Sequence, residues 1–162
     1  MTTSSFTLED VEKCVEDAIS EFRKRDLQLL ELSVNEQAAT HRIAGYLQNC
    51  FSEWDVDCEY NRKKTDPKKL HGVLVKPDIL IHRRNSTENL LCIEAKKAGG
   101  SLAEDRSKLC GFTDPNGEYR YQFGFLMIFS LDMPYSINGE WYQDGRLISS
   151  FVSRSNQGEN ND

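Results

Sequence analysis

Apolar residues near the start of the chain recur every three or four positions. This spacing predicts an amphipathic helix over residues 7–25, with an apolar face made of Leu8, Val11, Val15, Ile19 and Phe22. The stretch Ser33-Val34-Asn35-Glu36 has the pattern of a capping box and predicts a second helix, which runs to about Phe51. We therefore expect the chain to begin with two helices.

After the second helix the apolar period shortens to that of strands. Three β-branched or aliphatic runs, over residues 56–60, 73–82 and 89–96, are separated by polar connections and predict three strands. A second capping-box pattern at Ser101-Leu102-Ala103-Glu104 predicts a helix to about Gly111, and residues 121–129 predict a buried strand. The predicted order of elements is therefore α-α-β-β-β-α-β.

The remaining residues predict one domain with a polar tail. Trp141 and residues 147–152 allow a last hairpin, and the polar residues 153–162 predict a disordered tail behind a single domain over residues 1–152. Five scattered cysteines, with no C-x-x-C pair, predict neither a disulfide framework nor a zinc clip. The amino-terminal residues lack the features of a signal peptide, which predicts a cytoplasmic protein with no membrane partner.

Charge is distributed unevenly along an acidic chain. The net charge of −6 argues against a protein that coats nucleic acid. Residues 1–60 carry −8 and residues 98–162 carry −4, but residues 61–97 carry +6. Such a basic segment is what local contact with phosphates needs, although a solvated lysine-rich loop would have the same composition.

The sharpest chemical feature is a pair of acidic residues within two neighbouring apolar runs. Asp78 lies in Val75-Lys76-Pro77-Asp78-Ile79-Leu80-Ile81, and Glu94 and Lys96 lie in Leu90-Leu91-Cys92-Ile93-Glu94-Ala95-Lys96. Side chains alternate between the faces of a strand, so Glu94 and Lys96 share one face and the aliphatic residues take the other. One face is expected to be apolar and the other to carry the candidate functional side chains.

A hairpin centred near Ser86 would pair the apolar residues of the two runs and set Asp78 opposite Glu94. A slip of one residue would put carboxylates into the apolar layer, which favours this register. Two half-buried carboxylates side by side repel unless a proton or a cation lies between them. With the exposed carbonyl of Ala95 they would suit Mg²⁺ or Mn²⁺. Lys76 would face Lys96 in this register, so we expect the strands to splay or the sheet to end there.

These residues resemble the motif of the PD-(D/E)XK nuclease superfamily, which has the restriction-endonuclease-like fold. Pro77-Asp78 matches the first half of the motif and Glu94-Ala95-Lys96 the second. The resemblance also covers the α-β-β-β-α-β order from about Glu36 to Phe129. It implies an α/β fold with a mixed central sheet flanked by helices, here with an extra amino-terminal helix.

The resemblance implies roles for individual residues. Asp78 and Glu94 would bind the metal and Lys96 would be the catalytic lysine. Glu36 is the match for a further metal-binding glutamate, although a capping-box role explains it as well. Lys108 is the match for a polar residue on the following helix, although an ion pair with Asp105 is the simpler interpretation.

Other residues are weaker candidates for nucleic-acid contact, and for each a solvated surface role is the simpler alternative. They are His41, Arg42, Arg62, Lys63 and Lys64.

The function predicted from the sequence is hydrolysis of phosphodiester bonds in nucleic acid, in DNA by the resemblance. No helix-turn-helix or zinc module is evident, so a homodimer or a partner protein is expected to supply specificity. The main alternative is a noncatalytic binding or regulatory protein that keeps the nuclease fold, for example in a defence or phage-related assembly. A carboxylate-lined fold with no role in nucleic-acid chemistry is a third possibility.

Overall fold

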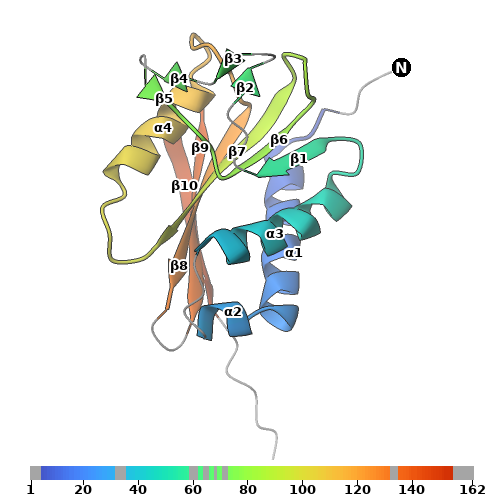
Figure 1. Ribbon diagram of the computed structural model, residues 1–162, viewed down its shortest axis with the longest axis vertical. Coiled ribbons are helices and arrows are strands. Elements are labelled where there is room, and N and C mark those ends of the chain that lie inside the picture. The colour runs from blue at the N-terminus through green and yellow to red at the C-terminus, as the bar shows by residue number, and fades with distance from the viewer. Residues whose placement is uncertain are drawn as a thin grey trace, which may run out of the picture.

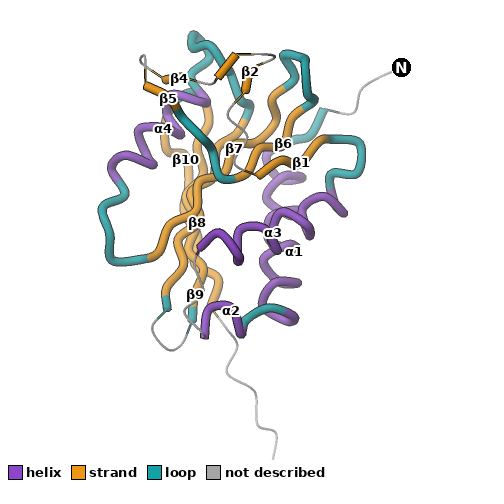
Figure 2. Tube along the Cα trace, viewed as in Figure 1, coloured by secondary structure: helices purple, strands orange, loops and turns teal. Residues whose placement is uncertain are grey.

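The chain folds around a six-stranded mixed sheet with helices on both faces, which is an α/β architecture (Figure 1). The computed structural model describes residues 5–31, 36–58, 62–63, 66–67, 69–70, 73–131 and 135–154. Neighbouring strands in the sheet follow the order β1 (Asp55–Cys58), β6 (Ile79–His82), β7 (Asn89–Lys97), β8 (Phe123–Ser130), β9 (Ser136–Gln143) and β10 (Arg146–Arg154). The tube in Figure 2 shows this sheet between α1 and α3 on one side and α4 on the other.

The two predicted amino-terminal helices are present. The first, α1 (Leu8–Arg25), begins behind a capping box: Thr7 Oγ1 accepts from the Asp10 N–H at 3.2 Å, and Asp10 Oδ2 accepts from the Thr7 N–H at 2.9 Å. A four-residue helix that was not predicted, α2 (Gln28–Glu31), precedes α3 (Glu36–Cys50). Residues 33–35 of the capping box predicted for α3 lie outside the described residues. None of the described helices has both the length and the apolar character needed to cross a membrane.

Strands β1, β6 and β7 form an antiparallel meander, and β7 is then joined to β8 through α4 (Ala103–Thr113). Because that connection crosses over, β8 pairs with β7 in parallel. The last hairpin, β9–β10, is confirmed, and β10 extends to Arg154, two residues into the predicted tail. Residues 155–162 of that tail lie outside the described residues.

The strand predicted over residues 73–82 is interrupted. Its first part, β5 (Val73–Leu74), pairs with β4 (Lys69–Leu70) outside the main sheet, as β3 (Asp66–Pro67) pairs with β2 (Arg62–Lys63). Pro77 lies in the interruption, where its missing N–H and fixed φ disfavour a continuous central strand.

Both faces of the sheet are apolar, which corrects the expectation that one face would be apolar and the other would carry the candidate functional side chains. The face under α1 and α3 includes Ile79, Ile81, Leu91, Ile93 and Ala95. The face under α4 includes Leu80, Cys92 and Leu126, which belong to one apolar cluster with Leu109 and Phe112 of α4. On β7, the polar residues of this second face, Glu94 and Lys96, therefore lie at one end of the strand.

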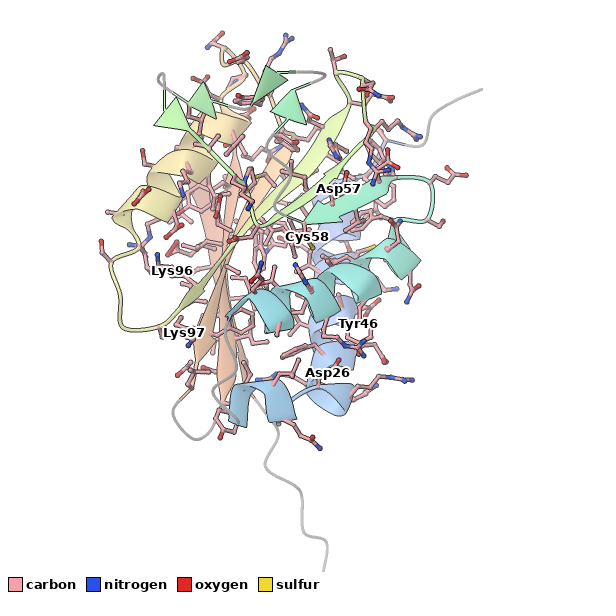
Figure 3. The ribbon with its side chains drawn as sticks, in the orientation of Figure 1. Asp26, Tyr46, Asp57, Cys58, Lys96 and Lys97 are labelled. Carbon is pink, nitrogen blue, oxygen red and sulfur yellow. A yellow bond between two sulfur atoms is a disulfide. The ribbon has the colours of Figure 1, made fainter. Side chains whose placement is uncertain are left out.

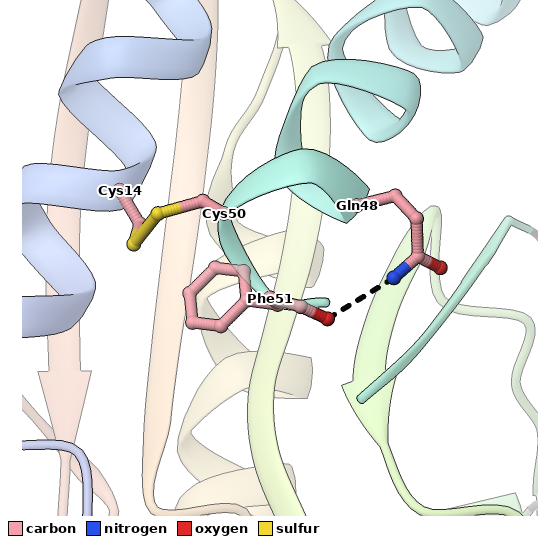
Figure 4. Close-up of a disulfide and its surroundings, with 4 residues drawn as sticks. All are labelled: Cys14, Gln48, Cys50 and Phe51. Carbon is pink, nitrogen blue, oxygen red and sulfur yellow. Dashed lines mark hydrogen bonds between the residues drawn. A yellow bond between two sulfur atoms is a disulfide. The ribbon is translucent and has the colours of Figure 1, made fainter. Parts of the chain in front are cut away.

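A disulfide between Cys14 and Cys50 joins α1 to the last residue of α3, with the two Cα atoms 5.8 Å apart (Figure 4). The prediction of no disulfide was wrong, because the packing of α3 against α1 brings together cysteines that are 36 residues apart. Close by, Gln48 Nε2 donates to the Phe51 carbonyl at 3.0 Å and fixes the turn that leaves α3. Persistent disulfides are rare in reducing compartments, so this bond does not favour the predicted cytoplasmic location.

Candidate functional site

The hairpin register predicted from the apolar pattern is the one observed. Ile79 pairs with Ile93, Leu80 with Cys92 and Ile81 with Leu91. The pairing ends at Ile79, so the ladder stops one residue before the predicted pair of Asp78 with Glu94 and well before Lys76. Asp78 therefore lies just before the first residue of β6, beside the part of β7 that continues through Glu94 to Lys97.

Asp78 is held by the backbone of the neighbouring strand. Its Oδ2 accepts a hydrogen bond from the Ala95 N–H at 2.7 Å. Continuing the observed register by two positions places Pro77 opposite Ala95, and proline has no N–H to donate to a neighbouring carbonyl. The N–H and the carbonyl of one strand residue point toward the same neighbouring strand. The Ala95 carbonyl is thus directed toward the edge at which Asp78 lies.

Glu94 is a buried carboxyl that lies against Asp78. Only 3% of the residue is exposed, and its Oε1 has no hydrogen-bond partner. Burial raises the pKa of Glu94 well above its ordinary value, and the charge of Asp78 and a hydrogen bond with its carboxyl raise that pKa further. Burial and the neighbouring carboxyl thus both favour the neutral form of Glu94, as expected where two carboxylates would otherwise repel.

A third carboxylate, Asp105, reaches the same place from α4, and sequence reasoning missed it as a site residue. Its side chain is 7% exposed, and its Oδ2 lies 3.5 Å from Lys96 Nζ, within ion-pair range. That oxygen accepts no hydrogen bond, so we interpret the contact as electrostatic. The charge of Asp105 also raises the pKa of Glu94. Asp105, Glu94 and Lys96 therefore lie together at the end of β7.

A signal for Asp105 was present in the sequence. Its position has the helical spacing of Leu109 and Phe112, which are both buried in the core under α4. A carboxylate in an apolar stripe is unusual because its burial is costly. The sequence prediction instead paired Asp105 with Lys108, and that pairing is wrong: Lys108 Nζ lies 3.7 Å from Glu104 Oε1.

The capping box predicted at the start of α4 is also absent. The N-cap residue is Leu102, which has helical backbone angles and makes no side-chain capping bond. The Ala103 N–H instead reaches Ser101 Oγ at 3.5 Å, a long contact. Glu104 is consequently free to face Lys108, whose charge lowers the pKa of Glu94 and so partly opposes the effect of burial.

The remaining predicted residues are not brought into this cluster by the described contacts. Arg42 lies on α3, where its Nε donates to Asp26 Oδ1 at 3.2 Å. Figure 3 shows Asp26 and Tyr46 beside α1 and α3, away from Lys96. His41 is exposed on the same helix. Other predicted side chains lie outside the described residues: Glu36, Arg62, Lys63 and Lys64.

The donor set at the end of β7 consists of two carboxyls and one directed backbone carbonyl. Among the described residues, no group of three or more His, Cys, Asp or Glu side chains converges as a metal site. Mg²⁺ is commonly bound by only one or two carboxylates, with waters and substrate phosphates completing its shell. The unpartnered Oε1 of Glu94 and the all-oxygen donors therefore fit a hard divalent cation.

No protein-family model matches the chain, and no curated protein matches its sequence.

Proposed function

We propose that this protein is a divalent-metal-dependent nuclease that hydrolyses phosphodiester bonds, with DNA as the expected substrate. The observation that carries the proposal is the meeting of two carboxyls, Asp78 and Glu94, at one end of the sheet, with Glu94 buried and one of its oxygens unpartnered. A group that serves only stability would not be expected to combine these features, because each of them is costly.

A cation resolves the electrostatic conflict at Glu94. Asp78, Glu94 and the Ala95 carbonyl would hold Mg²⁺ or Mn²⁺, which would lower the pKa of a bound water and neutralise charge on the phosphate. Asp78 is already oriented by the Ala95 N–H, so the chain keeps one carboxylate oxygen fixed. Glu94 would release its proton as the cation enters, and metal binding is therefore expected to depend on pH.

Lys96 is suited to bind the scissile phosphate or to orient the attacking water. It follows Glu94 by two positions on the same strand, so both side chains belong to the same face of the sheet. Its side chain is 40% exposed, so a phosphate can reach the ammonium from solvent. Preorganised cations aimed at a phosphoryl group stabilise the charge that develops on it during reaction.

The order of elements supports the assignment to the restriction-endonuclease-like fold. From α3 the chain passes through β1, β6 and β7, crosses by α4 and enters β8 parallel to β7. This is the α-β-β-β-α-β order that the motif resemblance implied, with α1 as the added helix. The support comes from agreement between the motif and the elements that carry it, since a fold alone does not fix a function.

A noncatalytic protein that retains this fold is the second candidate. Its support is the net charge of −6 and the ion pair that already engages Lys96. The two candidates differ in what divalent metal does. The nuclease cleaves in its presence, whereas a binding protein holds nucleic acid without cutting it.

The test is cleavage of linear, circular and branched DNA, and of RNA, with Mg²⁺ or Mn²⁺. Asp78→Asn and Lys96→Ala are each expected to lower the rate by about 10²–10³-fold, the effect of removing one preorganised group. Lys97→Ala is the matched control, because it removes the neighbouring lysine, which alternation directs to the other face. Equal rates in the wild type and in all three variants would refute the assignment.

Calorimetry with Mn²⁺ supplies a measurement that needs no substrate. Binding is expected in the wild type, and Glu94→Gln is expected to lose it. Binding of nucleic acid without cleavage, in the wild type and the variants alike, would support the noncatalytic candidate.

A further inference from the structure

We propose that Asp105 is a positioning residue, whose carboxylate holds the Lys96 ammonium beside Glu94 before a phosphate arrives. This inference rests on the proposed function, because it assigns a role within the same site. It concerns how the site is prepared rather than which groups carry out the reaction.

Lys96 needs such a partner because lysine side chains are long and flexible. Ordering one of them costs up to about 2 kcal/mol of side-chain entropy. Lys96 projects from the end of β7 with 40% of its side chain exposed, and within the described residues its ion pair is with Asp105. Without that carboxylate, the ammonium would sample positions away from Glu94.

Asp105 has the properties of a residue kept for that contact. Its side chain is 7% exposed, and its Oδ2 accepts no hydrogen bond. A buried carboxylate oxygen that accepts no hydrogen bond is costly, and the neighbouring apolar residues Leu109 and Phe112 show that an apolar side chain would suit this surface of α4. The Lys96 charge and the amino-terminal end of α4, in whose first turn Asp105 lies, are what offset the cost.

A neighbouring ion pair shows what a surface contact on α4 looks like. Glu104 is 84% exposed and lies 3.7 Å from Lys108, one helical turn along. It belongs to the same turn as Asp105 and carries the same charge, but it faces solvent. Because Glu104 does not contact Lys96, it provides a matched control.

The experiment compares Asp105→Asn, Asp105→Glu and Glu104→Gln with the wild type. The first readout is the Lys96 ammonium resonance in ¹⁵N-lysine NMR, assigned with Lys96→Arg. We expect a slowly exchanging signal in the wild type and in Glu104→Gln, its loss in Asp105→Asn, and partial recovery in Asp105→Glu. This readout requires neither metal nor cleavage.

The second readout is steady-state cleavage of the DNA that the wild type cuts best. Asp105→Asn is expected to lower kcat by about 10- to 100-fold, the cost of misplacing a reacting group, with KM changed less than about 2-fold. Asp105→Glu should recover part of kcat. Melting temperatures show whether each variant is folded.

The outcomes separate this inference from the proposed function. An ordered Lys96 resonance in Asp105→Asn, or a kcat equal to that of Glu104→Gln, overturns the positioning role even if the wild type is a nuclease. If the resonance is present in the wild type and lost in Asp105→Asn, but the wild type neither cleaves nucleic acid nor binds Mn²⁺, the proposed function is overturned while the contact between Asp105 and Lys96 is confirmed.

Discussion

Replacing Glu94 with glutamine should remove one component of the way in which stability depends on pH. Glutamine has the shape of glutamate but no charge, so the variant removes the buried ionisable group and little volume. Burial and the neighbouring Asp78 raise the pKa of Glu94 above its ordinary value of 4.5. Between that value and the raised one, the folded protein binds about one proton more than the unfolded chain does.

The size of the effect follows from that single proton. A difference of one bound proton changes the free energy of unfolding by about 1.4 kcal/mol per pH unit. Since the folded state holds the extra proton, the contribution of Glu94 is fully present below pH 4.5 and is lost as the pH rises through the raised pKa. The stability of the metal-free wild type, minus that of Glu94→Gln, should therefore fall by up to about 1.4 kcal/mol per pH unit in this window.

Urea unfolding in EDTA at a series of pH values measures this difference, and the titrating groups that do not interact with Glu94 cancel between the two proteins. Glu104→Gln is the matched control, because it makes the same change on a side chain that is 84% exposed; its difference from the wild type should stay nearly flat. Mn²⁺ added near pH 8 should stabilise the wild type but not Glu94→Gln. A difference that is flat or rises with pH would falsify the assignment of a raised pKa to Glu94.

Three further variants test other parts of the structure. Cys14→Ser removes a cross-link between residues 36 apart and should cost about 3–4 kcal/mol in urea unfolding, whereas added reductant should destabilise only the wild type. Gly139→Ala would place a Cβ 2.3 Å from the ring of Phe125 and should cost about 1–3 kcal/mol by calorimetry; an unchanged melting temperature would contradict this packing. Burial alone raises the pKa of Asp57, but hydrogen bonds such as that from Arg84 lower it on balance below 3.8. Asp57→Asn should therefore cost about 1–3 kcal/mol near neutral pH and progressively less as the pH falls below 3.8. An equal loss of stability at neutral and at low pH would argue against the hydrogen bonds between Arg84 and the charged Asp57 carboxylate.

The hairpin register could be predicted because two features of the sequence constrain it. Aliphatic residues must share the buried faces, and a one-residue slip would exchange carboxylates for aliphatic side chains. The pairing of Ile79 with Ile93 follows from that constraint. The first helix could be predicted from its apolar residues alone, because they recur with helical spacing and form the buried face of α1.

Features that depend on how elements pack could not be predicted in this way. The burial of Glu94 depends on where α4 lies over the sheet, and nothing in the strand itself specifies that position. The disulfide likewise depends on the packing of α3 against α1, because a spacing of 36 residues carries no pattern of its own. Asp105 stood in a visible apolar stripe, but its partner Lys96 is contributed by another element.

The hydrogen bond from the Ala95 amide gives the site a built-in reporter. In the middle of a sheet, an amide is normally protected from exchange with deuterium by a carbonyl of the next strand. The amide of Ala95 is bonded instead to the Asp78 carboxylate, at 2.7 Å. Its exchange rate should therefore respond to what Asp78 binds, while the amides of Ile93 and Leu91, within the β6–β7 ladder, respond only to opening of the sheet. The exchange rate of the Ala95 amide, compared with those of Ile93 and Leu91, thus distinguishes binding at the site from opening of the sheet.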